Sequence, residues 1–508
     1  MRGPRRDRRT PRQPLFVVLL ALAAGAMLVP ALHATALDDG VTARAFFSGA
    51  MVLGLGTAIL GLALRGRLPD ESAFAQLAAL LAAYTVLPLV LAVPFQSAAG
   101  GGLGAAWFEM VSAFTTTGAT LWDRPETLAP SLHLWRALVG WFGGLLIWVA
   151  AMAILAPLSL GGFEVRASLG RGDLSTRFSQ VTRTAGPYER LDRYFSQLVP
   201  IYVGLTLALW ILLIAARVDP FTAICHAMSV MATSGITPGY GTQAGGGTIL
   251  AEVVILAFLL LALTRRSYAR SLPGETERQG LMGDPEFQLG LGVIGLGAAA
   301  LFARHWLFSS EGTNALTAIR ALWGDLFTVA SFLTTLGFES RYWDSATAWS
   351  GLETPGLVLL GLAIFGGGIG TTAGGVKLLR VYALYKHGLR EIERLIHPSS
   401  VGGAGAEARR IRRAGALVAW IFFMLFAMSL AAIMLALSWV GVPFEDALVL
   451  AVAALANCGP LAVVAAEVPI SYATLGQSGH AILGVAMVVG RVELLAIIAL
   501  LNPDFWRG

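Results

Sequence analysis

The hydrophobic positions of this chain gather into long runs that are separated by shorter polar stretches. Runs of about 20 apolar residues are long enough to cross a bilayer as helices. The pattern predicts about ten such spans, at 15–37, 44–64, 72–95, 131–158, 194–216, 247–264, 287–308, 353–388, 414–440 and 478–501. The first has a second interpretation as a signal peptide, because Ala34-Thr35-Ala36 follows the small-x-small pattern of a cleavage site.

Four further apolar segments lie between these spans, and each one leads to a glycine. They cover 104–117, 220–234, 319–336 and 444–458 and lead to Gly118, Gly235, Gly337 and Gly459. Segments of about 14 residues are too short to cross a membrane, which predicts re-entrant half-helices. Short external loops between ordinary hairpins are the alternative, and four such segments in register disfavour it.

The recurring order of span, half-helix, glycine loop and span predicts an all-α polytopic membrane protein. We expect four pseudo-repeats of helix, re-entrant pore loop and helix around one central pore, plus two extra N-terminal transmembrane helices. The predicted boundaries are 1–68 for the two-helix prefix and 69–165, 166–270, 271–400 and 401–508 for repeats 1 to 4.

The spacing of the four glycines suggests what the loops do. Successive glycines are 117, 102 and 122 residues apart, so each repeat contributes one loop. Glycine lets backbone carbonyls turn in directions that other residues disfavour, and rings of carbonyls replace the water shell of a cation in a pore. A half-helix also directs its partially negative carbonyl end toward the space beyond it. The pattern therefore predicts a cation pathway.

Composition and charge support a membrane protein and assign its sides. The 508 residues are 56% hydrophobic and 13% charged, with two cysteines that exclude a disulfide scaffold or a cysteine metal cluster. The arrangement of spans puts 28 of the 36 Lys and Arg residues on one side, which predicts cytoplasmic N- and C-termini. Nucleic-acid binding by Arg2–Arg12 is the alternative use of the basic head, and we predict no nucleic-acid partner.

Several motifs stand out along the chain: Thr115-Thr116-Thr117-Gly118-Ala119-Thr120, and residues 366–377, 390–398, 490–494 and 503–507. Together these motifs resemble the Trk/Ktr/HKT superfamily of potassium transporters, and most closely its bacterial TrkH-type subunits. The first motif is similar to the first filter of that family, and the others are similar to its further signatures. The resemblance covers nearly the whole chain and includes the two extra N-terminal spans.

The resemblance implies a pore-forming subunit for K⁺ uptake in the bacterial cytoplasmic (inner) membrane. It also implies a homodimer, a cytoplasmic nucleotide-binding regulatory subunit of the TrkA type, K⁺ as the transported ion and no covalently bound cofactor. By position, the selectivity filter would consist of Thr116, Thr117, Gly118, Thr233, Ser234, Gly235, Thr335, Leu336, Gly337, Asn457, Cys458 and Gly459. Ile236, Leu336 and Leu461 depart from the family pattern, so a weakly selective K⁺/Na⁺ pathway is the alternative.

A glycine-rich run interrupts the return segment of the third repeat and is expected to form an intramembrane gate. The predicted gate residues are Gly366, Gly367, Gly368, Gly370, Gly374, Gly375, Lys377 and Arg491. Close packing of neighbouring helices is the alternative for the glycines; a nucleotide loop lacks the strands it needs. The alternative to a gate role for Lys377 is a cation whose side chain extends to the membrane surface. Arg491 is a charge in mid-span, which faces the pore or pairs with an acid such as Glu493.

Weaker candidates have an ordinary structural explanation beside the functional one. Glu109 could add negative potential near the pore or hold a buried partner, and we expect His226 to be a packed core residue. Asp123, Glu339, Asp344 and Glu445 could attract cations to the outer face or be solvated carboxylates. The cluster at 409–413 is expected to lie near anionic membrane lipid, where it could also dock a regulatory partner.

Other function classes fit the sequence less well. An ion-coupled carrier predicts inverted repeats, whereas these units repeat in parallel. A membrane enzyme is not expected, because the chain has no His-Glu-x-x-His, Gly-x-Ser-x-Gly or Gly-Lys-Ser/Thr motif. A non-conducting regulatory homologue remains as an alternative, because the residues beside the filter glycines are altered.

Overall fold

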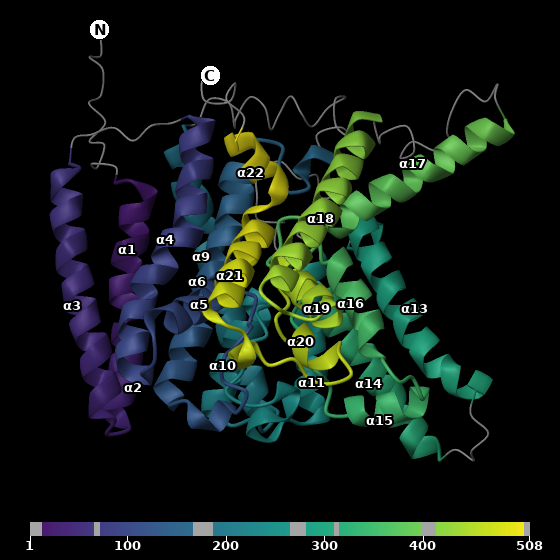
Figure 1. The fold of residues 1–508 in the computed structure, drawn as a ribbon, viewed down its shortest axis with the longest axis horizontal. Helices are drawn as coiled ribbons and strands as arrows, with labels where there is room; N and C mark the ends of the chain where they lie inside the picture. The colour runs from purple at the N-terminus through teal and green to yellow at the C-terminus, as the bar shows by residue number, and fades with distance from the viewer. Residues whose placement is uncertain are drawn as a thin grey trace, which may run out of the picture.

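The computed structural model describes residues 13–65, 72–165, 186–264, 281–308, 314–397 and 413–501, and its regular elements in these ranges are all helices. Eight of the helices described are long and apolar enough to cross a membrane, and a bent pair would make a ninth. They stand side by side, with α17 and α22 toward the upper side of the molecule and α15 toward the lower side (Figure 1). The prediction of an all-α polytopic protein is confirmed.

The N-terminal prefix forms one edge of the molecule. Helices α1 (Leu15–Ala26) and α2 (Leu28–Ala36) follow each other through Met27 as one span, and α3 (Gly40–Ala63) returns beside them. The side chain of Asp39 accepts a hydrogen bond from the Thr42 amide and so caps the start of α3. The prefix packs against α4 (Ala73–Ala99) of the first repeat (Figure 1).

Four units of similar order follow the prefix. Repeat 1 contains α4, α5 (Leu103–Phe114), η1 (Pro125–Thr127), α6 (Pro130–Ala150) and the π-helical turn η2 (Ala151–Leu155). Repeat 2 contains α9 (Pro187–Ala215), α10 (Pro220–Ala232), η3 (Gly241–Gly246), α11 (Ile249–Leu259) and η4 (Leu260–Leu263). Repeat 3 contains η5 (Leu281–Gly283), α13 (Pro285–Phe308), α14 (Ala315–Leu333), α15 (Trp343–Ser350), α16 (Gly356–Phe365) and α17 (Leu378–Ile396). Repeat 4 contains α18 (Arg413–Trp439), α19 (Phe444–Leu455), α20 (Leu461–Val464), η6 (Tyr472–Thr474), α21 (Gln477–Val492) and α22 (Leu494–Leu501).

The four predicted half-helices correspond to α5, α10, α14 and α19. The sequence sets their starts: Pro220 is the first residue of α10 and Asp219 caps its amides, while the Asn314 side chain caps α14. With 19 residues, α14 is long enough to count among the eight candidate spans. The half-helices end inside the molecule, so the residues that follow them are brought together there.

The return helices differ from simple spans in three repeats, which accounts for the smaller number of candidate spans than predicted. In repeat 2, α11 has only 11 residues before the 3-10 turn η4. In repeat 3, α16 and α17 flank a non-helical loop at 366–377, where the glycines interrupt the helix. In repeat 4, α21 and α22 bend by 94° at Glu493, which has a φ of 74°.

Some predictions concern residues outside the described ranges. They include most of the basic N-terminal head, most of the 409–413 cluster and the motif at 503–507. The proposed repeat boundaries also fall in or beside undescribed segments, and they stay predictions.

Candidate functional site

Each half-helix leads into a short loop, and we number these loops by repeat. Loop 1 is Thr116-Thr117-Gly118, loop 2 is Thr233-Ser234-Gly235, loop 3 is Thr335-Leu336-Gly337 and loop 4 is Asn457-Cys458-Gly459. The first residues of loops 1 to 4 have φ values of 57°, 48°, 58° and 53°. Non-glycine residues rarely adopt this left-handed conformation, so the four loops share one uncommon backbone turn.

The hydrogen bonds of the loops repeat as well. The amide of the second loop residue donates to a carbonyl oxygen five residues earlier in the half-helix, over 2.8 Å in loop 1 and 2.9 Å in the other three. The donor and acceptor pairs are Thr117 and Ser112, Ser234 and Ser229, Leu336 and Ser331, and Cys458 and Ala453. The common turn therefore depends on the backbone and tolerates four different side chains.

The glycines of the loops lie against one another. A side-chain carbon at Gly118 would stand 2.0 Å from the Ser234 carbonyl oxygen, and one at Gly235 would stand 2.5 Å from that of Leu336. At Gly459 the carbon would stand 2.2 Å from the Ala119 amide nitrogen. These distances leave no room for any residue larger than glycine. The structure brings all four predicted loops to one place.

The side chains of the second loop residues turn into the protein. Leu336 is fully buried in a cluster with Phe327 and Val230, and Cys458 is buried in another cluster beside Leu461. Neither side chain carries a hydroxyl group, and both contribute to packing. Any ion contact from these two residues would therefore have to come from their backbone carbonyls.

Loop 4 differs from the others in how its polar groups are used. The Gly459 amide donates to the Thr117 carbonyl oxygen over 2.6 Å, and the Tyr472 hydroxyl donates to the Gly459 carbonyl oxygen over 2.9 Å. The Asn457 side chain donates to the Thr117 hydroxyl and to the Met487 carbonyl oxygen. Gly459 is also absent from the glycines with positive φ, which include Gly118, Gly235 and Gly337. The arrangement is therefore only approximately fourfold.

The predicted gate glycines form a loop on the upper side of the four loops, and we call residues 366–377 the glycine-rich loop. The Gly374 amide donates to the Thr335 hydroxyl over 2.8 Å, and the Ile369 amide donates to Glu286 over 3.0 Å. A side-chain carbon at Gly374 would stand 1.9 Å from the carbonyl oxygen of Ala456, which precedes loop 4. The loop thus contacts loop 3 and the start of loop 4 directly.

The glycines of this loop divide into two groups. Gly366, Gly367 and Gly368 pack against backbone carbonyls, those of Gly374, Ala262 and Leu263 respectively. Gly370, Gly374 and Gly375 line a cavity together with Lys377 and Arg491. The cavity has a volume of about 30 Å³, which is room for about two water molecules. The glycine-rich loop therefore leaves only a small cavity between itself and α21.

Two buried cations hold this loop in place. Arg491, on α21, is 4% exposed and donates from Nη1 to the Thr372 carbonyl oxygen over 2.6 Å. Lys377 is 8% exposed, and its ammonium donates to the Ala373 carbonyl oxygen. Lys377 therefore does not extend to the membrane surface. Within the described ranges Arg491 forms no ion pair, so its expected alternative pairing with Glu493 does not occur.

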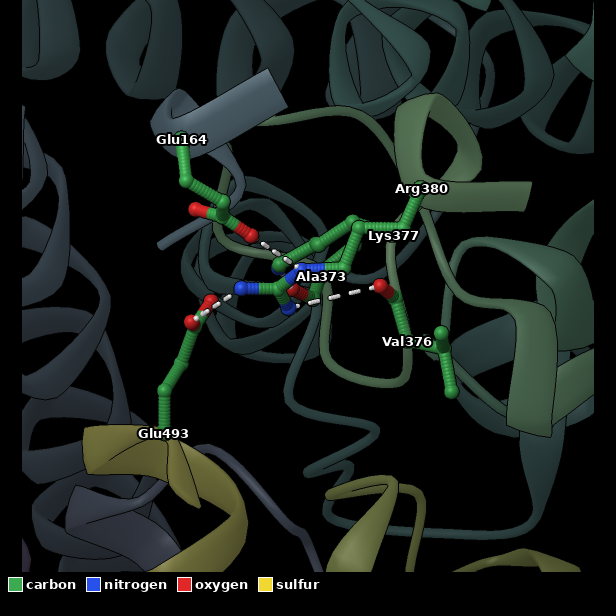
Figure 2. A network of polar contacts seen from close by, with 6 residues as sticks. All are labelled: Glu164, Ala373, Val376, Lys377, Arg380 and Glu493. Carbon is green, nitrogen blue, oxygen red and sulfur yellow. Dashed lines mark hydrogen bonds and ion pairs between the residues drawn. The ribbon is translucent and has the colours of Figure 1, made fainter. Parts of the chain in front are cut away.

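Glu493 instead belongs to a buried ion cluster that the sequence did not reveal. The Arg380 guanidinium lies 2.6 Å from Glu164 and 2.9 Å from Glu493, and its central carbon lies 3.6 Å from the centre of the Phe422 ring. Figure 2 shows the guanidinium between the two carboxylates, next to Lys377 and the end of the glycine-rich loop. The cluster joins repeats 1, 3 and 4. Its only sequence signal is that Arg380 follows Lys377 by one helical turn.

The weaker candidates have structural explanations in most cases. Glu109 is buried and lies 2.7 Å from Arg136, and His226 is buried with a hydrogen bond to Thr237. The described residues contain no group of three or more His, Cys, Asp or Glu that could hold a metal ion. Glu339 lies just beyond loop 3, where burial and then the charge of Asp344 raise the pKa of its carboxyl group to about 7.

These features define a membrane protein of four pseudo-repeats whose loops meet around one point, with a glycine-rich loop of the third repeat packed against two of them. The chain belongs to the TrkH family of cation transport proteins. A sequence model of this family, described as "TrkH: Cation transport protein", matches residues 294–504.

Relatives over nearly the whole chain establish the membership. The chain is 30% identical to the Trk system potassium uptake protein TrkH of Escherichia coli strain K12 over 495 residues, which cover 96% of this chain and 98% of the relative. It is 31% identical to the Trk system potassium uptake protein TrkI of Halomonas elongata, with 84% of this chain and 82% of the relative covered. The crystal structure of the potassium transporter TrkH from Vibrio parahaemolyticus matches with a TM-score of 0.78 and 27% identity, covering 97% of this chain and 98% of that one.

Proposed function

We propose that this chain is the pore-forming subunit of a Trk-type system for K⁺ uptake. Loops 1 to 4 would form the selectivity filter, in which backbone carbonyls replace the water shell of K⁺. The observation that carries the proposal is the uncommon backbone turn that occurs four times and places each loop glycine against the next loop around the ring. The relatives named as potassium uptake proteins support K⁺ as the transported ion.

The glycine-rich loop would act as the gate of this pathway. It lies against loop 3 and the start of loop 4, lines a cavity of about 30 Å³ together with Arg491, and accepts a hydrogen bond from Arg491. Its hydrogen bonds involve several separate elements, among them α13 through Glu286, loop 3 through Thr335 and α21 through Arg491, so a movement of those elements can release it. We infer that the structure represents a closed state.

Location and partners follow from family membership and from charge. We propose that the protein lies in the bacterial cytoplasmic membrane with the upper side of Figure 1 in the cytoplasm, which agrees with the positive-inside rule. We further propose a homodimer that binds a cytoplasmic, nucleotide-binding regulatory subunit of the TrkA type. Names that refer to a Trk system support additional subunits in general.

The test combines growth with ion flux. A bacterium that lacks K⁺ uptake systems would express this chain, alone and with a candidate regulatory subunit, on limiting K⁺. Rb⁺ and Na⁺ flux into proteoliposomes would be measured in parallel. We expect rescue of growth and a preference for Rb⁺. Absence of both rescue and flux, with folded protein confirmed in the membrane, would contradict the proposal and favour a non-conducting regulatory homologue.

Loop 4 favours a second candidate, a weakly selective K⁺/Na⁺ pathway. Protein groups already donate to the carbonyl oxygens of Gly459 and Thr117, so these oxygens are less free to bind an ion. Equal Rb⁺ and Na⁺ flux in the same proteoliposomes would support this candidate over K⁺ uptake.

A further inference from the structure

Glu252 has an unusual environment for a carboxylate near the lower side of a membrane protein. It lies near the start of α11 in repeat 2 and is 1% exposed. Its Oε1 accepts from the Arg341 amide over 2.6 Å and from the Thr242 hydroxyl over 2.7 Å. Its Oε2 accepts from the Trp323 indole N–H over 2.6 Å and from the Ser340 hydroxyl over 3.0 Å.

Three of these four donors belong to repeat 3 and lie on both sides of loop 3. Trp323 is on the half-helix α14, which leads into loop 3. Ser340 and Arg341 lie three and four residues after Gly337, the last residue of the loop. Glu252 therefore connects the segments before and after loop 3 from a neighbouring repeat. The Thr242 amide also donates to the Glu339 carbonyl oxygen over 3.4 Å, which adds a backbone contact between the same segments.

Only a carboxylate fits this environment. An ionised Glu has two oxygens that accept hydrogen bonds and no donor, and four donors face it here. Within the described residues it has no ion-pair partner, so the hydrogen bonds alone compensate its burial. An amide would place one NH₂ group against the indole N–H of Trp323, where two donors would face each other.

Loops 1 and 2 are supported by a side chain nine residues before the loop glycine, a place that Thr328 takes in repeat 3, where its hydroxyl accepts from the Ser340 amide over 3.2 Å; Glu252 adds a second support to loop 3. In repeat 1, Glu109 accepts from the Leu121 amide over 2.5 Å, just beyond loop 1, and pairs with Arg136. In repeat 2, His226 lies 2.9 Å from the Thr237 hydroxyl, beyond loop 2. Glu252 alone among these four belongs to a different repeat from the loop that it supports.

We propose that Glu252 is a positioning residue for ion selection: it fixes the carbonyls of loop 3 by holding the Trp323 side chain before the loop and the Ser340 side chain and Arg341 amide after it. This inference rests on the proposed function of the four loops as a filter. Because filter carbonyls discriminate between ions through their number and geometry, a loosened loop 3 changes which cation passes before it changes the fold.

The experiment compares Rb⁺ and Na⁺ flux in proteoliposomes for the wild type and for Glu252→Gln. Loss of a charged hydrogen-bond acceptor predicts a decrease of about tenfold in the Rb⁺/Na⁺ flux ratio. Adding Trp323→Phe to Glu252→Gln removes the donor that opposes the new amide. The double variant is therefore expected to recover part of the decrease in the Rb⁺/Na⁺ flux ratio. Glu126→Gln, which alters an exposed carboxylate in η1, is the matched control and is expected to keep the wild-type ratio.

The outcomes separate the inference from the proposed function. A wild type without ion preference would overturn the selective filter, and the inference with it. A selective wild type together with an unchanged Rb⁺/Na⁺ flux ratio in Glu252→Gln would overturn the inference alone. A loss of total flux in Glu252→Gln at a constant Rb⁺/Na⁺ ratio would also overturn it, because that result indicates a purely structural role. If Glu252→Gln does not fold, Ser340→Ala removes one donor and is expected to lower the ratio in the same direction; an unchanged ratio in that variant would overturn the inference.

Discussion

Single residues control how closely the four loops approach, and Gly118 is the tightest position. Its φ is 77°, and any side chain would overlap the Ser234 carbonyl oxygen. Alanine there combines backbone strain of about 1–2 kcal/mol with a steric overlap, so loops 1 and 2 must separate. We expect Gly118→Ala to remove the preference for Rb⁺ over Na⁺ in proteoliposome flux.

Gly104 provides a matched control for this substitution. It lies on α5, the same half-helix, and has nothing within 4 Å of the position that a side-chain carbon would take. Gly104→Ala is therefore expected to keep the wild-type Rb⁺/Na⁺ ratio. Equal ratios in wild type and Gly118→Ala would exclude loop 1 from the filter.

Glu339 predicts a dependence of flux on external pH. It lines an open pocket of about 620 Å³ with Asp344 and Glu353, and burial followed by the charge of Asp344 raises its carboxyl pKa to about 7. The carboxyl group is neutral below this pKa and negative above it, so acidification removes one charge that attracts cations. The attraction between one negative charge and a cation about 8 Å away in water is about 0.5 kcal/mol. Loss of this attraction predicts about twofold lower Rb⁺ influx at about pH 6 than at about pH 8.

Substitution tests the assignment to this residue. Glu339→Gln is expected to have the low flux at both pH values, and Glu445→Gln, which removes an exposed carboxylate on α19, is expected to keep the wild-type pH profile. A pH profile that persists in Glu339→Gln would assign the titration to another group.

The glycine-rich loop and its contacts act at the scale of elements. Arg491 connects α21 to this loop through the Thr372 carbonyl oxygen. A hydrogen bond to a charged group contributes about 1.5–3 kcal/mol, so its loss favours release of the loop. We expect Arg491→Ala to raise Rb⁺ flux by about tenfold or more in the absence of any regulatory subunit.

Arg44→Ala is the control for this prediction, because it removes an exposed arginine from α3 in the prefix. Its flux is expected to equal that of the wild type. Unchanged or lower flux from folded Arg491→Ala protein would show that Arg491 does not keep the loop closed.

The elements themselves were largely predictable, but the contacts between them were not. Hydrophobic runs located the half-helices, and the glycines at 366–375 located the break between α16 and α17. The partners of Glu493 were not predictable, because Arg380 and Glu164 are far from it in the chain and come together only when three repeats pack. The same reason hid Glu252, because three of its four donors lie in the next repeat.

For the whole molecule, the cluster of Arg380, Glu164 and Glu493 is a junction between repeats 1, 3 and 4. Arg380 is fully buried, and the two carboxylates are less than a tenth exposed. Removing one member of a buried ion cluster leaves charges without compensation, whereas replacing all members costs much less. The cluster therefore couples the packing of the repeats to the end of the glycine-rich loop.

We expect Arg380→Met to destabilise the protein by about 3–5 kcal/mol, because two buried carboxylates lose their cation. Methionine preserves contact with the Phe422 ring, so the decrease in stability measures the effect of removing the positive charge. The midpoint of thermal unfolding in detergent, followed by size-exclusion chromatography, measures the effect.

A triple variant provides the control. Adding Glu164→Gln and Glu493→Gln to Arg380→Met removes the unpaired charges, and we expect it to regain most of the decrease in the unfolding midpoint. A triple variant no more stable than Arg380→Met would show that Arg380 stabilises the junction by its shape and hydrogen bonds rather than by its charge.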